Sequence, residues 1–422
     1  MNKQQNQADV VSRRDVIKTA AAVAGAAMAV PAVHAAGTGK LKVGIVGCGR
    51  RGRGAAKDCM SSASDLELVA MGDLFKGNVD SAADEMKSLG DKFKVTPETR
   101  FSGFDSYLQV INAGIDVVLL VTPPGFRPMQ LKAAVEAGKH VFMEKPCAVC
   151  PAGIKSIIAS SELAAKKGLS IVSGTQRRHE NKYFEMMKRV HDGAIGDVIA
   201  AEVYWQGDYG YYPAVHKKPE WSEMEWQIRN WNYFTWLSGD HIVEQHVHNM
   251  DIARWAMRVN PNKAMANGSR QVRTGPEFGH IYDNFSVSYE FPNGFVLSMS
   301  RQMSGTSNRI WERIIGTKGR ATAGRIEGEN PWSYDGPNPN PYVQEHTHLI
   351  DAIRNGKPIN EGVQNAESTM MAILGRMSAY TGREISWQWA MNGSKLDLMP
   401  QKLDLGPLEV PAVAVPGQTK LV

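Results

Sequence analysis

The chain is poor in cysteine: only Cys48, Cys59, Cys147 and Cys150 occur among its 422 residues. Four cysteines are too few for a disulfide scaffold, and a chain of this length buries enough apolar surface without one. Long basic runs are also missing and the net charge is only +5, so a nucleic-acid or membrane-surface role is not indicated. No segment is long and apolar enough to cross a bilayer. The length instead predicts two domains.

Residues 1–35 have the pattern of an export signal. The run SRRDVIK (12–18) is positively charged, residues 19–33 are apolar and rich in alanine, and residues 33–35 give a small-x-small cleavage site. The run resembles the twin-arginine motif, which addresses proteins that are exported already folded. The alternative is a general secretory signal with two adjacent arginines. We expect a soluble mature protein in the periplasm, exported through the twin-arginine pathway.

Strand and helix patterns alternate through residues 40–178. Short connections between them predict a parallel sheet wound on both faces, that is, an α/β domain. The predicted strands are 41–46, 66–73, 115–124, 140–146 and 169–178, and the predicted helices are 50–62, 79–90, 127–138 and 151–167.

The pattern changes in residues 179–394. Residues 284–303 alternate with period 2 around a Pro-Asn-Gly turn, which predicts a hairpin, and residues 313–323 continue the strand pattern. Another strand is predicted at 197–205, and helices at 181–192, 239–257, 341–355 and 363–381. We therefore expect an α+β domain with a mostly antiparallel open sheet. The proline-rich tail 395–422 is either an arm that wraps a neighbouring subunit or a frayed end, and the arm is favoured.

The sequence GCGRRG, residues 47–52, is a G-x-G-x-x-G motif. It closes a predicted strand and opens a predicted helix, the context that makes this motif specific for a dinucleotide. The first glycine permits a tight turn, the second lets the backbone approach a pyrophosphate, and the third allows close packing of helix on strand. A glycine-rich turn without a ligand is the alternative. The predicted cofactor-binding residues are Gly47, Gly49, Arg50, Arg51 and Gly52.

Asp73 ends the second predicted strand, 26 residues after Gly47. A carboxylate in that position accepts hydrogen bonds from the adenosine ribose and repels a 2′-phosphate, so NAD is favoured over NADP. Arg50, Arg51 and Lys76 leave NADP open, since a nearby cation accommodates that phosphate.

The sequence MEKP, residues 143–146, follows the fourth predicted strand, at the edge of the sheet where ligands bind. A lysine beside a cofactor orients a substrate hydroxyl and stabilises developing negative charge. The alternative is a surface Glu–Lys pair ahead of a helix.

Together these motifs resemble those of the Gfo/Idh/MocA oxidoreductase family. The matching residues are the loop GIVGCGRRG, Asp73, TPP at 122–124, EKP at 144–146 and GTQRR at 174–178. The resemblance implies a Rossmann domain followed by an open-sheet domain, and hydride transfer between a nicotinamide and a sugar-like carbinol. It implies that Lys145 is the catalytic lysine. It also adds Thr122, Pro123, Glu144 and Lys145 to the cofactor site, and Arg177 and Arg178 to the substrate site.

The second half of the family's site is usually an acid followed four residues later by histidine. Glu244 and His248 stand in that relation and would share one face of a helix. His248 would accept the hydroxyl proton, and its reference pKa near 6.5 suits that task. Glu244 would orient the imidazole or hold a substrate hydroxyl. The family commonly has Asp and a small residue where this chain has Glu244 and His246, so the substrate does not carry over.

Three further features have two interpretations each. His241, Glu244 and His248 have a spacing that suits Zn²⁺, but a polar stripe facing substrate is favoured and no metal is expected. The segment 204–236 holds 11 of the 34 aromatic residues; some are core, and others, Trp231 among them, suit stacking on sugar rings. Cys147 and Cys150 form a C-x-x-C whose cysteines are either redox-active or paired in an oxidising periplasm or, as favoured, packed in the core.

An exported enzyme that uses NAD must carry its own cofactor, because little free NAD is expected outside the cytoplasm. We therefore expect an oxidoreductase acting on a sugar or polyol CH–OH group, with NAD (or NADP) tightly bound. One alternative is a redox-neutral glycosidase or epimerase; another is a non-catalytic sugar-binding protein with structural nucleotide. The family resemblance implies a homo-dimer or tetramer formed through the open sheet.

Overall fold

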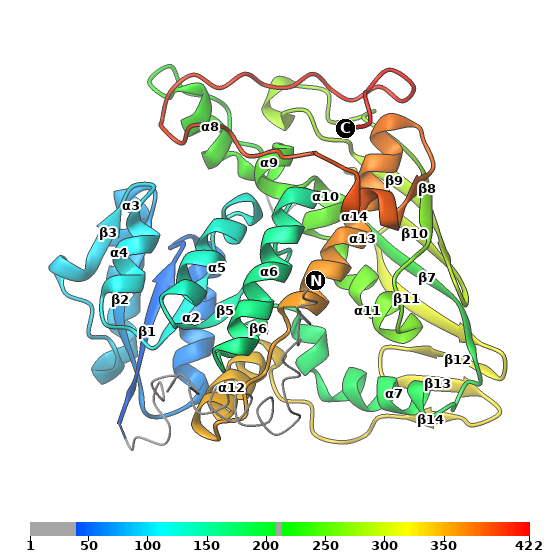
Figure 1. Cartoon of the computed structure of the whole chain (residues 1–422), viewed down its shortest axis with the longest axis horizontal. Helices are drawn as coiled ribbons and strands as arrows, with labels where there is room; N and C mark the ends of the chain where they lie inside the picture. The colour runs from blue at the N-terminus through cyan, green and yellow to red at the C-terminus, as the bar shows by residue number, and fades with distance from the viewer. Residues whose placement is uncertain (1–38, 208–212) are drawn as a thin grey trace, which may run out of the picture. The chain divides into compact units, whose positions relative to one another are not determined.

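The computed structural model describes residues 39–207 and 213–422 (Figure 1). Its first sheet has six parallel strands in the order β3-β2-β1-β4-β5-β6. The strands are β1 (Leu41–Val46), β2 (Leu66–Asp73), β3 (Arg100–Ser102), β4 (Val117–Leu120), β5 (His140–Met143) and β6 (Ile171–Ser173). Most of their apolar residues are buried, on both faces of the sheet, as expected for parallel strands covered by helices. The predicted Rossmann domain is confirmed, with β3 as an additional edge strand.

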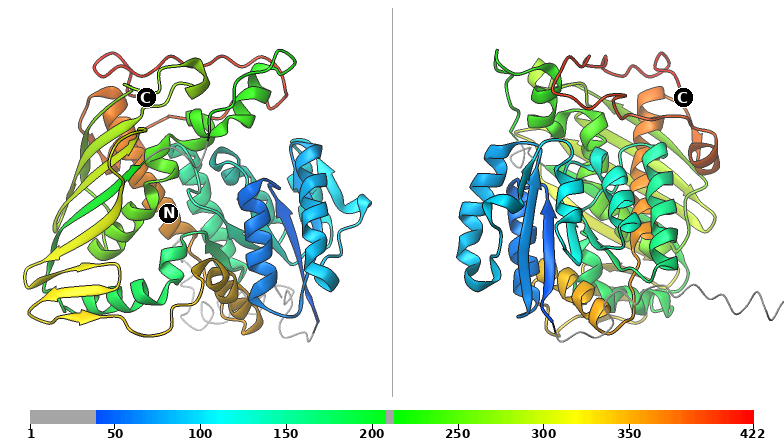
Figure 2. Two further views of the ribbon diagram at one scale, coloured as in Figure 1. Left: turned by 180° about the vertical axis from the view of Figure 1, so that it is seen from behind. Right: turned by 60° about the vertical axis from the view of Figure 1, so that its left-hand side comes forward.

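Helices cover both faces of this sheet (Figure 2). One face packs against α2 (Arg50–Ser62), α3 (Lys76–Met86) and the late helix α12 (Pro341–Arg354). The other packs against α4 (Ser106–Asn112), α5 (Arg127–Glu136) and α6 (Pro151–Lys166). Because α12 contacts α2, a segment predicted in the second domain packs on the first.

The second sheet has nine strands in the order β14-β13-β12-β11-β7-β10-β9-β8-β15. Neighbouring strands are antiparallel except β10 and β7, so the sheet is mixed. The strands are β7 (Val198–Gly207), β8 (Lys263–Ser269), β9 (Asn284–Phe291), β10 (Gly294–Gln302), β11 (Arg309–Gly316), β12 (Gly319–Thr322), β13 (Arg325–Gly328), β14 (Trp332–Ser333) and β15 (Ile385–Ser386). The predicted hairpin is β9–β10, and its buried residues alternate with exposed ones.

Helices α11 (Val247–Met257) and α13 (Gly362–Thr381) pack on one face of this sheet. The domain also contains α7 (Asn181–His191), α8 (Glu223–Arg229), α9 (Thr235–Ser238), α10 (His241–Glu244) and α14 (Trp387–Asn392). Among the described residues, no helix is long and apolar enough to cross a membrane. The predicted export signal lies outside the described residues.

Several sequence-based boundaries are wrong. The strand predicted at 115–124 is the shorter β4, the strand predicted at 140–146 ends at Met143, and the helix predicted at 79–90 ends at Met86, where a 3₁₀ helix (Lys87–Lys92) follows. The strand predicted at 169–178 ends at Ser173, and residues 176–179 form a 3₁₀ turn. The helix predicted at 239–257 is instead two helices, α10 and α11. The two helices are separated at Gln245 and His246, which belong to neither. The predicted start at 239 is also wrong: Gly239 and Asp240 have φ angles of 78° and 76°, so α10 begins only at His241. The Asp240 carboxylate caps α10 at the His241 N–H and also accepts a hydrogen bond from the Tyr282 N–H, which fixes this turn.

The tail 395–422 packs along its own chain. Its main-chain carbonyls at Gly406, Leu408 and Ala414 accept hydrogen bonds from Met224, Gln227 and Tyr282 respectively. Figure 1 shows the tail, in red, running past α8. It is therefore not a frayed end within this structure.

All four cysteines are buried and none forms a disulfide. Burial raises the pKa of the Cys147 thiol to about 12, and its sulfur lies 3.6 Å from the Thr369 hydroxyl. A protonated, enclosed thiol is a poor nucleophile. The C-x-x-C motif thus packs in the core, as favoured from the sequence.

Buried histidines should make the protein sensitive to mild acid. Burial lowers the pKa of His246 to about 3 and of His280 to about 4, whereas both titrate near 6.5 when unfolded. Between these pKa values the unfolded state binds more protons, so the free energy of unfolding falls as pH falls below about 6.5. His280 alone accounts for about 2 kcal/mol between pH 7 and pH 5. Urea unfolding at both pH values should show that His280→Gln removes this part of the loss, while replacing the exposed His216 by Gln does not. An equal loss in all three proteins would contradict it.

Candidate active site

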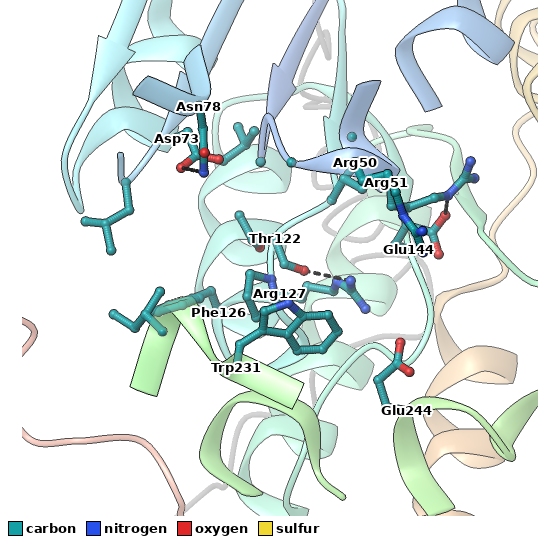
Figure 3. Close-up of a pocket in the computed structure, with 18 of the residues that line it drawn as sticks. Arg50, Arg51, Asp73, Asn78, Thr122, Phe126, Arg127, Glu144, Trp231 and Glu244 are labelled. Atoms are coloured by element: carbon teal, nitrogen blue, oxygen red, sulfur yellow. Dashed lines mark hydrogen bonds and ion pairs between the residues drawn. The ribbon is translucent and has the colours of Figure 1, made fainter. Parts of the chain in front are cut away.

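A cleft of about 950 Å³ lies at the carboxyl ends of the parallel strands. Its lining comes from both domains: the glycine loop and the ends of β2, β4 and β5 on one side, and the segments 213–231 and 244–248 on the other. Figure 3 shows Asp73 and Asn78 at one end, Arg51 and Glu144 at another, and Trp231 and Glu244 reaching in from the second domain. This is the edge of a doubly wound sheet where ligands bind.

The three glycines of the loop have the properties that a dinucleotide requires. Gly47 has φ +99°, a left-handed conformation in which a side chain would be strained. A Cβ on Gly52 would lie 1.8 Å from the Gly47 carbonyl oxygen, so only glycine lets α2 approach the turn this closely. A Cβ on Gly49 would meet nothing within 4 Å. Gly49 is also the N-cap of α2 and supplies no side-chain cap, so the helix N-terminus faces open space, where it attracts phosphate.

Asp73 is held by the loop itself. Its carboxylate accepts hydrogen bonds from the backbone N–H groups of Cys48 (2.8 Å) and Phe75 (2.9 Å) and from the Asn78 amide (3.0 Å). Burial raises the pKa of Asp73, although the three hydrogen bonds act to lower it. Carboxylate oxygens retain further acceptor capacity, so Asp73 can receive ribose hydroxyls as the sequence predicted. The residues present fit a dinucleotide.

Arg51 lies in the cleft, but its guanidinium is committed to carboxylates. It contacts Glu144 at 2.5 Å, Asp58 at 3.1 Å and Glu345 at 3.2 Å. Burial alone would raise the pKa of Glu144, but the charges of Arg51, Arg127 and Lys145 hold it below the ordinary value. Burial and the charge of Glu144 raise the pKa of Glu345 well above its usual range. Arg51 therefore fixes Glu144, and with it the start of the EKP segment, rather than serving mainly as a phosphate ligand.

Lys145 meets Glu244 across the cleft. Its ammonium donates to the Glu244 main-chain carbonyl at 2.6 Å and to the carboxylate at 3.2 Å, and both side chains are nearly buried. Lys145 follows β5, whereas Glu244 ends α10 of the second domain. The contact brings together the two halves of the site that the sequence predicted separately.

His248 lies in the first turn of α11 and lines the same cleft. Its ring stacks on Trp205 with centroids 5.6 Å apart. Burial and the charge of Lys145 lower its pKa well below the usual value, so its imidazole is neutral near pH 7 and can accept a proton. Although the helix is broken between Glu244 and His248, both residues still face the cleft.

The predicted site residues divide into those that line the cleft and those that do not. The cleft lining includes the predicted residues Gly47, Gly49, Arg50, Arg51, Gly52, Asp73, Thr122, Pro123, Glu144, Lys145, Trp231, Glu244 and His248. The predicted substrate residues Arg177, Arg178 and His241 are not in that lining. Each of these side chains has an acidic partner outside the cleft lining. Arg177 pairs with Glu312, Arg178 makes a bidentate pair with Asp251, and His241 is fully buried beside Asp240.

Sequence reasoning missed several lining residues. Asn78, Arg229, Gln176, Gln245 and Tyr342 all line the cleft. Asn78 and Arg229 lie on ordinary helices without a motif, so no sequence signal marks them. Gln176 falls inside the segment GTQRR, and Gln245 lies next to Glu244, so their neighbours were informative.

The zinc alternative finds no support in the arrangement of these side chains. Within residues 39–207 and 213–422, no group of three or more His, Cys, Asp or Glu side chains is placed to hold a metal ion. His241 Nδ1 lies 3.0 Å from Asp240 Oδ1, and His241 does not line the cleft with Glu244 and His248.

Comparison with known proteins gives a consistent match. Residues 41–174 match a model described as "Oxidoreductase family, NAD-binding Rossmann fold", and residues 183–322 match "GFO/IDH/MocA C-terminal domain". The chain is 24% identical over 338 residues to scyllo-inositol 2-dehydrogenase (NAD(+)) of Bacillus subtilis, covering 75% of this chain and 87% of the relative.

Solved structures share the fold. Scyllo-inositol dehydrogenase from Lactobacillus casei, with bound NAD(H) and scyllo-inositol, has a TM-score of 0.62 at 22% identity. Aldose-aldose oxidoreductase from Caulobacter crescentus, complexed with glycerol, has a TM-score of 0.64 at 22% identity. Each alignment covers 82% of this chain and 99% of the other.

Proposed function

Because this chain belongs to the Gfo/Idh/MocA oxidoreductase family, with its NAD-binding Rossmann domain, we propose that it is an exported oxidoreductase. It oxidises or reduces a sugar or polyol carbinol with a tightly held NAD. The observation that carries the proposal is the meeting of Lys145, Glu244 and His248 at one end of the dinucleotide cleft.

The three side chains divide the work on a substrate hydroxyl. Bound NAD supplies the hydride acceptor. The neutral imidazole of His248 takes the proton of the hydroxyl as its carbon is oxidised. The Lys145 ammonium donates a hydrogen bond to the carbinol oxygen and stabilises the negative charge that develops there. Glu244 keeps the ammonium in place through its carbonyl and carboxylate.

The surroundings of these residues suit a polyhydroxylated substrate. Trp205 and Trp231 line the cleft with the polar side chains of Gln176 and Gln245. Indole faces stack on the apolar faces of sugar rings, while amides and carboxylates bind hydroxyls. The names of two similar proteins agree with a sugar or polyol substrate: one is a scyllo-inositol 2-dehydrogenase and the other an aldose-aldose oxidoreductase. We assign the class of substrate and not the individual sugar.

Export is the second half of the proposal. The twin-arginine-like run at residues 12–18 addresses a folded protein, and a folded protein can cross the membrane with its cofactor inside. A retained cofactor has to be regenerated in place by a second substrate or by the same sugar. The exported enzyme can therefore work only if NAD stays bound to the chain after export.

The test is to purify the protein from the periplasm without added nucleotide, denature it, and identify released nucleotide by mass and absorbance. We expect about one NAD(H) per chain. Absence of nucleotide would reject the retained cofactor. A separate product assay distinguishes the chemistry: a ketone or reduced sugar supports oxidoreduction, whereas release of an aglycone without net oxidation would favour the glycosidase.

We also propose that the chain forms a homo-oligomer through the second sheet. On the face away from α11 and α13, Met265 and Phe295 are about half exposed (49% and 52%), and Tyr204 and Trp311 form an aromatic pair with centroids 5.8 Å apart. Exposed apolar side chains on one face of a sheet support such an interface. Sedimentation that gives a monomer at micromolar concentration would contradict this.

A further inference from the structure

The end of the cleft that holds Asp73 is enclosed partly by the second domain. On the Rossmann side it is lined by Asp73, Leu74, Phe75, Asn78 and Phe104. Opposite them the lining contains Pro213, Val215, Trp221, Ile228 and Arg229. Asp73 is the acid placed to bind the adenosine ribose of a dinucleotide, so the second domain faces the adenosine half of the cleft too.

Arg229 joins the two sides through aromatic rings. Its guanidinium carbon lies 3.9 Å from the centre of the Phe75 ring, in the Rossmann domain, and 4.8 Å from the centre of the Trp221 ring. Contacts of this length are attractive cation–π interactions. The guanidinium is close enough to Asp73 for its charge to lower the pKa of that carboxyl, against the larger effect of burial.

The charge of Arg229 is balanced on its own helix. Its Nε donates to the Glu225 carboxylate at 2.9 Å, and a terminal nitrogen lies 2.8 Å from the same oxygen. A guanidinium paired with a carboxylate is a poor ligand for a further phosphate. Its planar group is instead suited to contact with flat rings and with hydroxyl acceptors.

Helix α8, which carries Arg229, is fixed from two directions. The Trp226 indole donates to the Val215 carbonyl at 2.6 Å, and the Val215 N–H donates to Asn230 at 2.9 Å, which ties the segment at 213–215 to the helix. On the far side the tail carbonyls of Gly406 and Leu408 accept hydrogen bonds from α8. These hydrogen bonds tie the helix to the segment at 213–215 and to the tail.

We propose that Arg229 and Trp221 form a second-domain wall of the adenosine subsite. The wall contacts a purine nucleoside by stacking and hydrogen bonding, and it does not bind a 2′-phosphate. With both domains holding the adenosine half, NAD leaves only when these contacts are broken. The residues therefore slow the release of the cofactor. The inference needs a bound NAD but is independent of which sugar is used.

The experiment follows release of adenine-labelled NAD. Purified protein is exchanged with labelled NAD, freed of excess by gel filtration and chased with unlabelled NAD. For Arg229→Met and Trp221→Leu we expect release at least about tenfold faster than in the unaltered protein. The affinity of ADP-ribose should fall by a similar factor, whereas that of nicotinamide mononucleotide should stay the same.

Three controls make the result decisive. Arg313→Met removes another guanidinium that lies beside an aromatic ring, Trp311, outside the cleft lining, and should leave release unchanged. Arg229→Lys keeps the charge but not the planar group, and should release NAD faster than the unaltered protein. Thermal unfolding of each variant identifies a fold defect. If Trp221→Leu fails to fold, Trp221→Phe, which keeps an aromatic ring, replaces it. Where both fold, Trp221→Phe should release NAD more slowly than Trp221→Leu.

The proposal is overturned by any of three results. Release of NAD unchanged within twofold in folded Arg229→Met would show that the wall does not hold the cofactor. An equal loss of affinity for nicotinamide mononucleotide would place the effect at the wrong end. A selective loss of NADP binding would make Arg229 a 2′-phosphate ligand instead. None of these readouts depends on catalysis, so they remain distinct from a failure of the sugar oxidoreductase assignment.

Discussion

Lys145→Met is expected to lower kcat for the sugar or polyol substrate by about 10³-fold, since removing one donor from a developing oxyanion costs about 10²–10³ in rate. Lys145 is the cation at the catalytic end of the cleft that contacts Glu244 directly. Cofactor affinity should change much less, because the glycine loop and Asp73 stay intact. Steady-state kinetics measures the loss of kcat, and quenching of tryptophan fluorescence by NAD measures the cofactor affinity.

A loss of Lys145 also leaves Glu244 buried without its cation, which costs stability. The double variant Lys145→Met with Glu244→Gln removes that charge and should recover folding but not activity. Lys139→Met is the matched control, since its ammonium bonds to the Ile115 carbonyl and does not line the cleft. Retention of kcat within tenfold in folded Lys145→Met would exclude the lysine as the group that stabilises the oxygen.

His248→Gln should lower kcat for oxidation by about 10²–10⁴-fold, the usual contribution of a general base. Glutamine keeps a polar side chain but cannot take the proton. Because burial and Lys145 lower the pKa of His248 well below 6.5, the unaltered enzyme should lose no oxidation rate through this histidine until the pH is well below 6.5. A pH profile of kcat/KM for both proteins measures this.

The contrasting variant is His241→Gln. His241 is completely buried beside Asp240 and outside the cleft, so we expect its loss to lower the free energy of unfolding and to leave kcat within about tenfold. If His241→Gln slowed oxidation as strongly as His248→Gln while still folding, the assignment of the base to His248 would be wrong.

The local elements of the first domain could be predicted because parallel strands and their helices have distinctive patterns. Strand β1 and helix α2 have the predicted bounds, since a continuous apolar run and a glycine turn determine both. The left-handed turn at Gly239 and Asp240, which delays the start of α10 to His241, could not be predicted. It depends on hydrogen bonds from Tyr282 and Tyr380, which are distant in sequence. A helical pattern alone does not record such contacts.

For the site, the sequence by itself determined the chemical groups: a dinucleotide loop, an acid at the ribose position, a lysine after β5, and an acid and histidine four residues apart. Motif spacing carries that information because each group is fixed to a strand end or a helix turn. Only the tertiary structure decided which groups meet. It places Lys145 against Glu244, removes His241 and Arg178 from the cleft by pairing each with a buried aspartate, and brings Arg229 to the adenosine end. Those outcomes depend on the packing of two domains, which no local pattern encodes.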